Sequence, residues 1–407
     1  MNGIRERTFT RRAAALPACL LSLVAAPGAG DPSARARALH ERALTIDSHG
    51  FIPPRSCGST DLQVDFAKMR KGGLDAVFGV VYAEQQRRTA PAYAEAMRRA
   101  EQAFHEIHET VRRCHREVAL ARTPDDVERI AGSGKLAVVI GIENGFVLGR
   151  ELSLLERYRD SGAAYIGLTH DGHNDIADSA TPRERLGDAA SEHGGVSAFG
   201  GQVIAGMNRL GILVDVSHMS KAATLDAIRL SRAPVIASHS SLHAIVPTPR
   251  NMDDETLLAL AAKGGVIQVT AVHSFVKVDP PGATKAFFAL LDEFGIETDA
   301  GAKDLPPGGR AEFQARQTQM ERRWALATVA QMVDHIDYAV SLAGIDHVGI
   351  GSDFEGGGGL AGWADASETV NVTAELLRRG YTEEEIRKIW GGNLLRAWRK
   401  ARKLSTP

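Results

Sequence analysis

The sequence predicts an α/β fold in which eight parallel strands close into a single barrel. Short and almost entirely apolar segments recur along the chain, and helix-like stretches separate them. Strands that are apolar along their whole length are typical of a parallel sheet covered on both faces. Eight strand–helix units between residues 44 and 353 agree with a (β/α)8, or TIM, barrel. The eight apolar segments are residues 44–47, 76–82, 136–142, 164–169, 212–216, 234–237, 265–270 and 348–351.

The stretches between these segments predict the helices that cover the barrel. An open, doubly wound sheet is the structural alternative, because it also alternates strands with helices. No Gly-x-Gly-x-x-Gly motif follows the first apolar segment, so the dinucleotide-binding form of that fold loses its main support. The predicted helices are residues 92–113, 124–131, 152–160, 196–210, 222–230, 253–262 and 322–343.

The composition is that of a globular protein. Of 407 residues, 44% are hydrophobic and 24% are charged, which excludes a disordered chain, a collagen-like chain and a polytopic membrane protein. Lys and Arg number 48 against 50 for Asp and Glu, so the net charge is −2. Because there is no basic excess, we expect no nucleic acid partner.

Residues 1–30 predict a removable secretory signal rather than a part of the fold. Arginines at positions 5, 7, 11 and 12 precede an uncharged run over residues 13–27, and small residues follow. The run is too short for a spanning helix of about 20 residues, so we expect membrane contact at most through this segment. An uncleaved anchor is the alternative. We expect an exported, periplasmic protein, and Arg11-Arg12 is compatible with the twin-arginine route.

Residues 31–407 are predicted to form one barrel domain with long connections at about 84–135 and 274–321. Long loops after barrel strands shape the active-site face, so the second connection is either a lid or a surface insertion. The signal carries four arginines and one glutamate, and its removal changes the net charge from −2 to about −5. In an oxidising compartment Cys57 and Cys114 either pair or stay independent buried thiols.

Polar side chains stand at the ends of six of the eight predicted strands. The carboxyl ends of parallel barrel strands meet at one face, so we expect these six side chains to converge there. Histidine nitrogen and carboxylate oxygen are ligands of zinc-type divalent metals, and a central carboxylate can bridge two ions. The six residues are His49, Glu143, His170, His218, His239 and Asp353.

The motifs around these residues resemble those of the membrane (renal) dipeptidases, a family of zinc peptidases with a (β/α)8 barrel. The resemblance extends over residues 43–399, nearly the whole chain after the predicted signal. It rests on Gly141-Ile142-Glu143-Asn144-Gly145, Leu168-Thr169-His170, Asp215-Val216-Ser217-His218, Ala237-Ser238-His239-Ser240-Ser241, Pro249-Arg250-Asn251, Gly349-Ile350-Gly351-Ser352-Asp353-Phe354 and Gly391-Gly392-Asn393.

The resemblance implies which residues bind metal. Glu143 would bridge two zinc ions, and His218 and His239 would be the other protein ligands of one ion. His49 would bind the second ion. Asp353 would be the acid/base group near the bridging water and a further candidate ligand.

The resemblance also implies hydrolysis of the peptide bond of a dipeptide by a metal-activated water. Asp353 would pass a proton to the leaving amine, and His170 would orient the substrate and stabilise the oxyanion. Arg250 would hold the C-terminal carboxylate of a dipeptide or small peptide, because its guanidinium can form two parallel hydrogen bonds. A homodimer is compatible with the sequence.

One position departs from the family's first motif, which is Asp-x-His-x-Asp. The chain reads Asp47-Ser48-His49-Gly50-Phe51, so Phe51 stands where the motif has a metal-binding Asp. Loss of an anionic ligand should weaken the second ion site, which leaves either one or two zinc ions open. Asp47 or Glu84 could replace the missing ligand.

This departure leaves other functions open. A divergent family member with one metal could tailor a peptide natural product. A non-catalytic periplasmic binding protein is a third hypothesis, which the intact ligand set disfavours. Deaminase and lactonase barrels often have a carboxylated Lys where this chain has His170, and a His-x-His at the first strand that is absent here.

Overall fold

A single parallel sheet forms the centre of the molecule. The computed structural model describes residues 32–52, 57–58, 60–296, 305–324 and 327–405, and the predicted signal at 1–30 lies outside these ranges. The sheet order is β1-β2-β4-β5-β6-β7-β8-β9, with the short β3 paired to β4. The strands are β1 (Ile46–Gly50), β2 (Ala76–Tyr82), β3 (Val118–Leu120), β4 (Leu136–Glu143), β5 (Ala163–Gly167), β6 (Leu213–Asp215), β7 (Val235–Ser240), β8 (Val266–Thr270) and β9 (Val348–Gly351).

The sheet closes between its first and last strands. The Phe51 amide donates to the Phe354 carbonyl at 3.2 Å, and the Asp353 amide donates to the His49 carbonyl at 2.9 Å. A parallel bridge joins Gly50 to Phe354. The predicted eight-stranded barrel is therefore confirmed, and the open-sheet alternative is wrong. All eight predicted apolar segments are barrel strands, and β3 is an addition that the sequence did not reveal.

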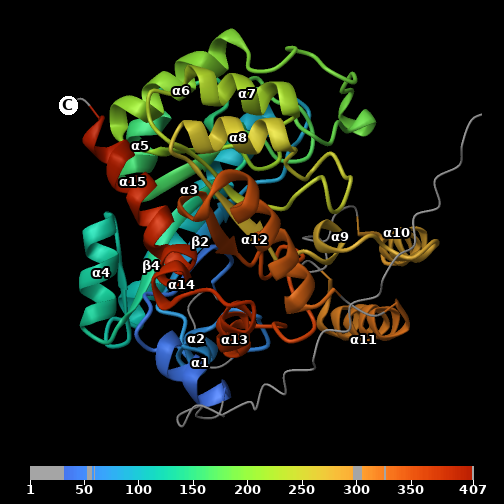
Figure 1. Ribbon diagram of the computed structural model, residues 1–407. Coiled ribbons are helices and arrows are strands. Elements are labelled where there is room, and N and C mark those ends of the chain that lie inside the picture. The colour runs from blue at the N-terminus through green and yellow to red at the C-terminus, as the bar shows by residue number, and fades with distance from the viewer. Residues whose placement is uncertain (1–31, 53–56, 59, 297–304, 325–326, 406–407) are drawn as a thin grey trace, which may run out of the picture.

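Helices surround the barrel (Figure 1). Those after successive strands lie next to one another, as α6, α7 and α8 do along one side. The helices are α1 (Pro32–His40), α2 (Phe66–Gly72), α3 (Ala90–Arg113), α4 (Pro124–Gly132), α5 (Leu154–Asp160), α6 (Ala198–Leu210), α7 (Lys221–Leu230), α8 (Asp254–Ala262), α9 (His273–Val276), α10 (Ala283–Glu293), α11 (Pro307–Trp324), α12 (Val329–Ala343), α13 (Val370–Arg378), α14 (Glu383–Arg387) and α15 (Asn393–Lys403).

One predicted helix, over residues 322–343, is wrong at its start. The helix α12 begins at Val329, and Thr328 caps it. The Thr328 side chain accepts from the Gln331 amide, while the Gln331 side chain accepts from the Thr328 amide. This capping box provides hydrogen-bond acceptors for the amides of Thr328 and Gln331, as is typical of the first turn of a helix. The helix therefore starts at Val329.

Tyr165 on β5 fills the barrel interior beneath the carboxyl ends of the strands. Its ring stacks on Phe78 with 5.6 Å between centroids, and both side chains are fully buried. A Cβ atom at Gly141 on the neighbouring strand would lie 2.1 Å from the Tyr165 ring, so only glycine leaves room for it. The packed Tyr165 ring forms the floor of the site and lies directly below the polar residues at the strand ends.

The two long connections are built differently. The segment 84–135 contains α3, β3 and α4, and a disulfide joins Cys57 to Cys114 at the end of α3 with Cα atoms 5.4 Å apart. The segment 274–321 contains α10 and α11, which lie beside α9 at one edge of the molecule (Figure 1). They pack on each other through their own apolar cluster, which includes Leu290, Leu291 and Phe313. Among the described residues, no helix is both long enough and apolar enough to cross a bilayer.

Removing the disulfide should destabilise the fold. The bond closes a loop with a sequence separation of 57, and loop-closure entropy then contributes on the order of 4 kcal/mol to the free energy of unfolding. We expect the double variant Cys57→Ser/Cys114→Ser to unfold at a lower urea concentration than the oxidised wild type. Wild-type protein in reducing agent is the control and should match the variant. Equal midpoints for oxidised wild type and variant would contradict the prediction.

Candidate metal centre

Five of the six polar strand-end residues gather around the carboxylate of the sixth, Glu143. Glu143 is the last residue of β4, His49 and His239 lie within β1 and β7, and the other three follow β5, β6 and β9. Five of the six are buried, and His170 is partly exposed. From Glu143 Oε1 the Nε2 atoms lie at 3.1 Å for His218, 3.4 Å for His239 and 3.6 Å for His170, and from Oε2 the His49 Nε2 atom lies at 3.5 Å.

Glu143, His218 and His239 present a compact set of three ligand atoms. The two histidine Nε2 atoms are 2.9 Å apart, and they lie 3.1 and 3.4 Å from Glu143 Oε1. Two ligands bound to a tetrahedral zinc ion at 2.0–2.1 Å are separated by about 3.3 Å. The three atoms therefore fit a zinc-type ion with little movement.

His49 provides a second set of ligand atoms on the other side of Glu143. Its Nε2 atom is buried and has no hydrogen-bond partner. Ligand atoms of His49, Glu143 and His239 lie within 4.8 Å of one another, and Asp353 Oδ1 is 3.7 Å from His49 Nε2. A buried and unpaired imidazole nitrogen is costly unless a cation or proton binds it, so this set also fits a metal ion.

The set of ligand atoms around His49 has one charged oxygen fewer than the Asp-x-His-x-Asp motif would give it, because Phe51 stands in place of the second Asp. Its ring stands edge-on to both His49 and Tyr82, with 6.4 Å between centroids in each pair. Asp47 and Glu84 were suggested as replacements for the missing ligand, but neither belongs to a candidate metal-binding group among the described residues. The Asp47 carboxylate accepts from the Ser352 amide and hydroxyl, and Glu84 pairs with an arginine at the surface.

Hydrogen bonds behind the histidines direct their Nε2 atoms toward Glu143. The Tyr165 hydroxyl lies 2.8 Å from His49 Nδ1 and donates to the Ser48 carbonyl, so it accepts from Nδ1–H. Ser238 donates to Asp215 at 2.6 Å and lies 2.8 Å from His239 Nδ1. In both rings the proton on Nδ1 leaves the Nε2 lone pair free for a metal.

A similar contact supports the third histidine. Asp171 Oδ1 lies 3.4 Å from His218 Nδ1, and the other Asp171 oxygen accepts from Arg183. The Asp171 carboxylate is therefore held between an arginine and the imidazole, and it keeps the imidazole Nε2 atom turned toward Glu143.

The charges of the site favour a cation between His49 and Glu143. Burial alone would lower the pKa of His49, but the carboxylates of Glu143 and Asp353 outweigh it and raise the pKa to about 9. Burial would raise the pKa of Glu143, yet His49 and His170 hold it well below its usual range. Burial raises the pKa of Asp353 to about 6, and burial together with His218 lowers the pKa of His170 to about 4. A bound metal ion would supply the positive charge that a proton on His49 supplies without it.

Two of the gathered residues have a left-handed backbone. The φ angles are 68° at His218 and 59° at Asp353, and Asn144 directly after Glu143 has 77°. Such angles are uncommon outside glycine and cluster at functional sites, because surrounding structure must hold them. The sharp turns aim the side chains inward at the point where each strand ends.

Arg250 contributes a buried positive charge next to this cluster. Its Nη1 donates to Ser240 Oγ at 3.3 Å and its Nη2 to the His239 carbonyl at 3.2 Å. Its Nε has no partner, and among the described residues no carboxylate forms a hydrogen bond with the guanidinium. The group packs on the Phe275 ring at 5.2 Å. A buried arginine that forms no direct pair with a carboxylate is ready to receive one from a ligand.

Three residues of the site were not predicted from the sequence. Tyr82 ends β2, lies opposite Glu143 in the parallel register, and packs on the His170 ring with 5.0 Å between centroids. A search of strand ends that included phenols would have found it. Asp171 directly follows His170, which is a usable signal. Nothing in the sequence marks Tyr165, because it lies inside an apolar strand.

Comparison with known proteins identifies the family of this chain. The family model described as membrane dipeptidase, peptidase family M19, matches residues 33–407. Among curated proteins, the Aspergillus oryzae protein named dipeptidase aclJ is 32% identical over 82% of this chain and 69% of its own length. The Claviceps purpurea protein named dipeptidase tcpJ is 31% identical over 83% of this chain and 69% of its own length.

Solved structures show the same fold. The structure of the probable dipeptidase PvdM from Pseudomonas aeruginosa matches with a TM-score of 0.80 and 34% identity, over 92% of this chain and 99% of that chain. A metallopeptidase from Rhodobacter sphaeroides, solved with a phosphinate mimic of L-Ala-D-Ala, shares the fold with a TM-score of 0.68 and 20% identity, over 88% of this chain and 99% of that chain. The resemblance seen in the motifs is thus confirmed, and the chain belongs to the membrane dipeptidase family, peptidase family M19.

Proposed function

We propose that this metal-dependent dipeptidase holds its principal ion, Zn²⁺, between Glu143, His218 and His239. The observation that carries the proposal is the set of three ligand atoms separated by 2.9–3.4 Å. All three residues are buried, and their nitrogen and oxygen donors are those that zinc prefers. The names of the similar proteins, dipeptidase aclJ and probable dipeptidase PvdM, support a dipeptide as the substrate.

The chain's own residues divide the remaining work. A bound divalent cation would polarise the scissile carbonyl and lower the pKa of water. Asp353 is buried with its Oδ1 atom 3.7 Å from His49 Nε2, so its carboxylate is placed beside the proposed metal to take a proton and return it to the leaving amine. His170 lies at the partly exposed edge of the cluster, where its Nε2–H can donate to a developing oxyanion.

Arg250 would orient the substrate by its free carboxylate. Its guanidinium is buried and reaches the His239 backbone carbonyl, so a carboxylate bound there would lie next to the ligand cluster. Every unmodified peptide has such a carboxylate at its C-terminus, and binding it here favours cleavage one residue away from that end. The names of the similar proteins support dipeptides over longer chains.

Phe51 sets the occupancy of the second ion site. His49 and Glu143 remain available there, with Asp353 Oδ1 3.7 Å from His49. An edge-on phenyl ring supplies no ligand, so we expect weaker binding of a second ion. The same apolar ring would also favour an apolar substrate group at this position, which makes tailoring of a peptide natural product the second candidate function.

The site would work in an exported protein. The Cys57–Cys114 disulfide supports an oxidising compartment, and the arginine-rich N-terminal sequence supports export to the periplasm. Both features are compatible with the twin-arginine route.

Replacing Phe51 by Asp should strengthen the second ion site. An added carboxylate beside His49 supplies the missing anionic ligand, so the zinc content should rise from about one to about two ions per chain. Elemental analysis after dialysis against a low zinc concentration measures this. Phe51→Leu removes the ring without adding a ligand and should stay at the wild-type content. Equal zinc content in Phe51→Asp and wild type would contradict the weak-site hypothesis.

Replacing Glu143 by Gln should remove metal and activity together. The amide has nearly the same shape but no charge, so zinc content should fall and kcat/KM for Ala-Ala should drop by at least roughly a hundredfold. Glu84→Gln, on the loop after β2, is the matched control and should leave both unchanged. If Glu143→Gln kept full zinc content and turnover, the proposed centre would be wrong.

Replacing Arg250 by Lys should reduce discrimination between a dipeptide and its C-terminal amide. A paired guanidinium is worth about 1.5–3 kcal/mol, so wild type should prefer the free carboxylate in kcat/KM by roughly 10- to 150-fold. In the variant we expect KM for the dipeptide to rise and the preference to shrink. Arg185→Lys, an exposed arginine paired with Glu84, is the control. An unchanged preference would show that Arg250 does not bind the carboxylate.

A further inference from the structure

One histidine joins both ends of the segment that carries α10 and α11 to the short helix α9. His273 is the first residue of α9, which follows β8. Its Nε2 atom lies 2.7 Å from Asp279 Oδ1, before α10, and its Nδ1 atom lies 2.7 Å from the Ala327 amide nitrogen, after α11. The α10 and α11 helices lie beside α9 at the edge of the molecule (Figure 1). His273 therefore holds the start and the end of this segment at one place.

The two hydrogen bonds of His273 fix one state of its ring. Because Nδ1 accepts from the Ala327 amide, the proton of the imidazole is on Nε2, which donates it to the Asp279 carboxylate. A hydrogen bond to a charged acceptor is stronger than one between neutral groups. The side chains of His273 and Asp279 are only 22% and 21% exposed, and Ala327 is fully buried, so water competes weakly for both bonds.

The same short helix carries Phe275, which contacts Arg250. The guanidinium carbon of Arg250 lies 5.2 Å from the centre of the Phe275 ring, within the range of attraction between a cation and an aromatic face. Asn251, the next residue along the chain, donates from its side chain to the Phe275 carbonyl at 2.9 Å. Phe275 is therefore attached to the Arg250–Asn251 pair through both its ring and its backbone.

The position of α9 depends on its contacts with other elements. The helix has four residues, and so short a helix is not stable alone, because the first turn fixes several backbone angles for few hydrogen bonds. At its end, His335 on α12 holds the Val276 carbonyl, with 3.1 Å between Nε2 and the oxygen. At its beginning, the side chain of His273 provides the corresponding attachment.

We infer that His273 is a positioning residue for the substrate carboxylate, an inference that rests on the proposed role of Arg250. His273 fixes the beginning of α9, and α9 presents the Phe275 ring to the guanidinium. Without the two His273 bonds α9 can shift, and Arg250 would then bind a carboxylate less tightly. The metal ligands would stay in place, because they follow other strands. The position of the α10–α11 segment is thereby linked to substrate affinity.

Replacing His273 by Ala in the zinc-loaded enzyme should weaken substrate binding selectively. We expect KM for Ala-Ala to rise, and the preference for the dipeptide over its C-terminal amide to shrink by roughly three- to tenfold, as for partial loss of a contact between a cation and an aromatic ring. Zinc content and kcat should stay at the wild-type values. His273→Asn should recover part of the preference, because its side-chain oxygen can still accept from the Ala327 amide.

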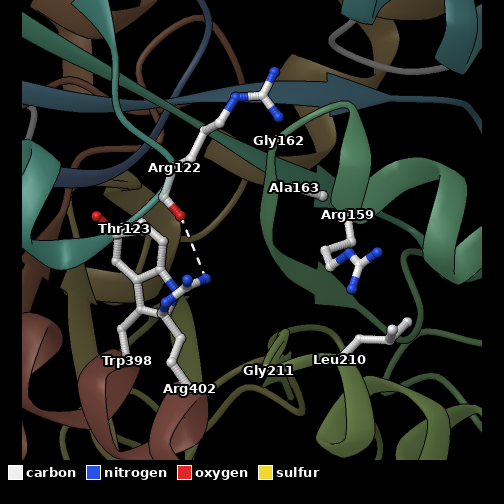
Figure 2. A pocket seen from close by; sticks show the side chains of 9 residues that line it. All are labelled: Arg122, Thr123, Arg159, Gly162, Ala163, Leu210, Gly211, Trp398 and Arg402. Carbon is white, nitrogen blue, oxygen red and sulfur yellow. Dashed lines mark hydrogen bonds between the residues drawn. The ribbon is translucent and has the colours of Figure 1, made fainter. Parts of the chain in front are cut away.

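Two control variants separate positioning from a general loss of stability. Leu210→Ala removes a buried side chain at the opposite end of the barrel, where Figure 2 shows Leu210 beside a small pocket at the end of α6. It should lower the melting temperature without changing the preference. His347→Ala removes a histidine that bonds to the Gly265 carbonyl before β8, and it should also leave the preference unchanged. An unchanged preference in His273→Ala, or an equal loss in Leu210→Ala, would overturn the inference.

Phe275→Leu tests the path from α9 to Arg250. The variant keeps an apolar side chain but removes the ring, so the preference should fall as in His273→Ala. The double variant should show no further fall, because both changes act on one contact, and additive losses would contradict the inference. If wild type showed no preference for a free carboxylate, the role of Arg250 would fail and this inference with it. A loss confined to Arg250→Lys would overturn this inference alone.

Discussion

The hydrogen bond from the Asp353 amide to the His49 carbonyl joins the two ends of the barrel and positions the metal centre at the same time. Asp47 reinforces the junction, because its buried carboxylate accepts from the amides of His49 and Ser352. The left-handed turn at Asp353 then directs its carboxylate toward His49. Closure of the sheet and assembly of the site are therefore one event, and a change that loosened this junction would affect both.

Within the closed barrel, one buried carboxylate is balanced by several imidazoles. Glu143 faces four histidines, and the hydrogen bonds behind three of them hold the rings with Nε2 directed inward. Such a set of ligands is prepared for a cation before the cation arrives, so little reorganisation accompanies binding. The floor of the site depends on packing as well as on hydrogen bonds, because the Tyr165 hydroxyl reaches His49 only where Gly141 leaves room for the Tyr165 ring.

Phe51 separates this chain from the ligand pattern that its first motif resembles. An apolar ring beside His49 removes one anionic ligand while the rest of the centre stays intact. The half of the site that contains His218 and His239 keeps its nitrogen and oxygen donors, and the half that contains His49 lacks the carboxylate of the motif. The difference from the motif is confined to one side chain and leaves the fold unchanged.

The strands and the residues that gather at their ends could be predicted from the sequence, because a parallel barrel places the carboxyl ends of all its strands on one face. The apolar segments predicted the strands, and the polar residues at the ends of six of them predicted which side chains would meet. The sequence did not show Tyr165, Asp171 or the pairing of Cys57 with Cys114, since each depends on a partner from another element. By itself the sequence determined the barrel, the six polar residues at its strand ends and the missing Asp at position 51. Only the tertiary structure decided which nitrogen of each histidine faces the centre and which charges stay unpaired, because those depend on hydrogen bonds between strands that local pattern does not specify.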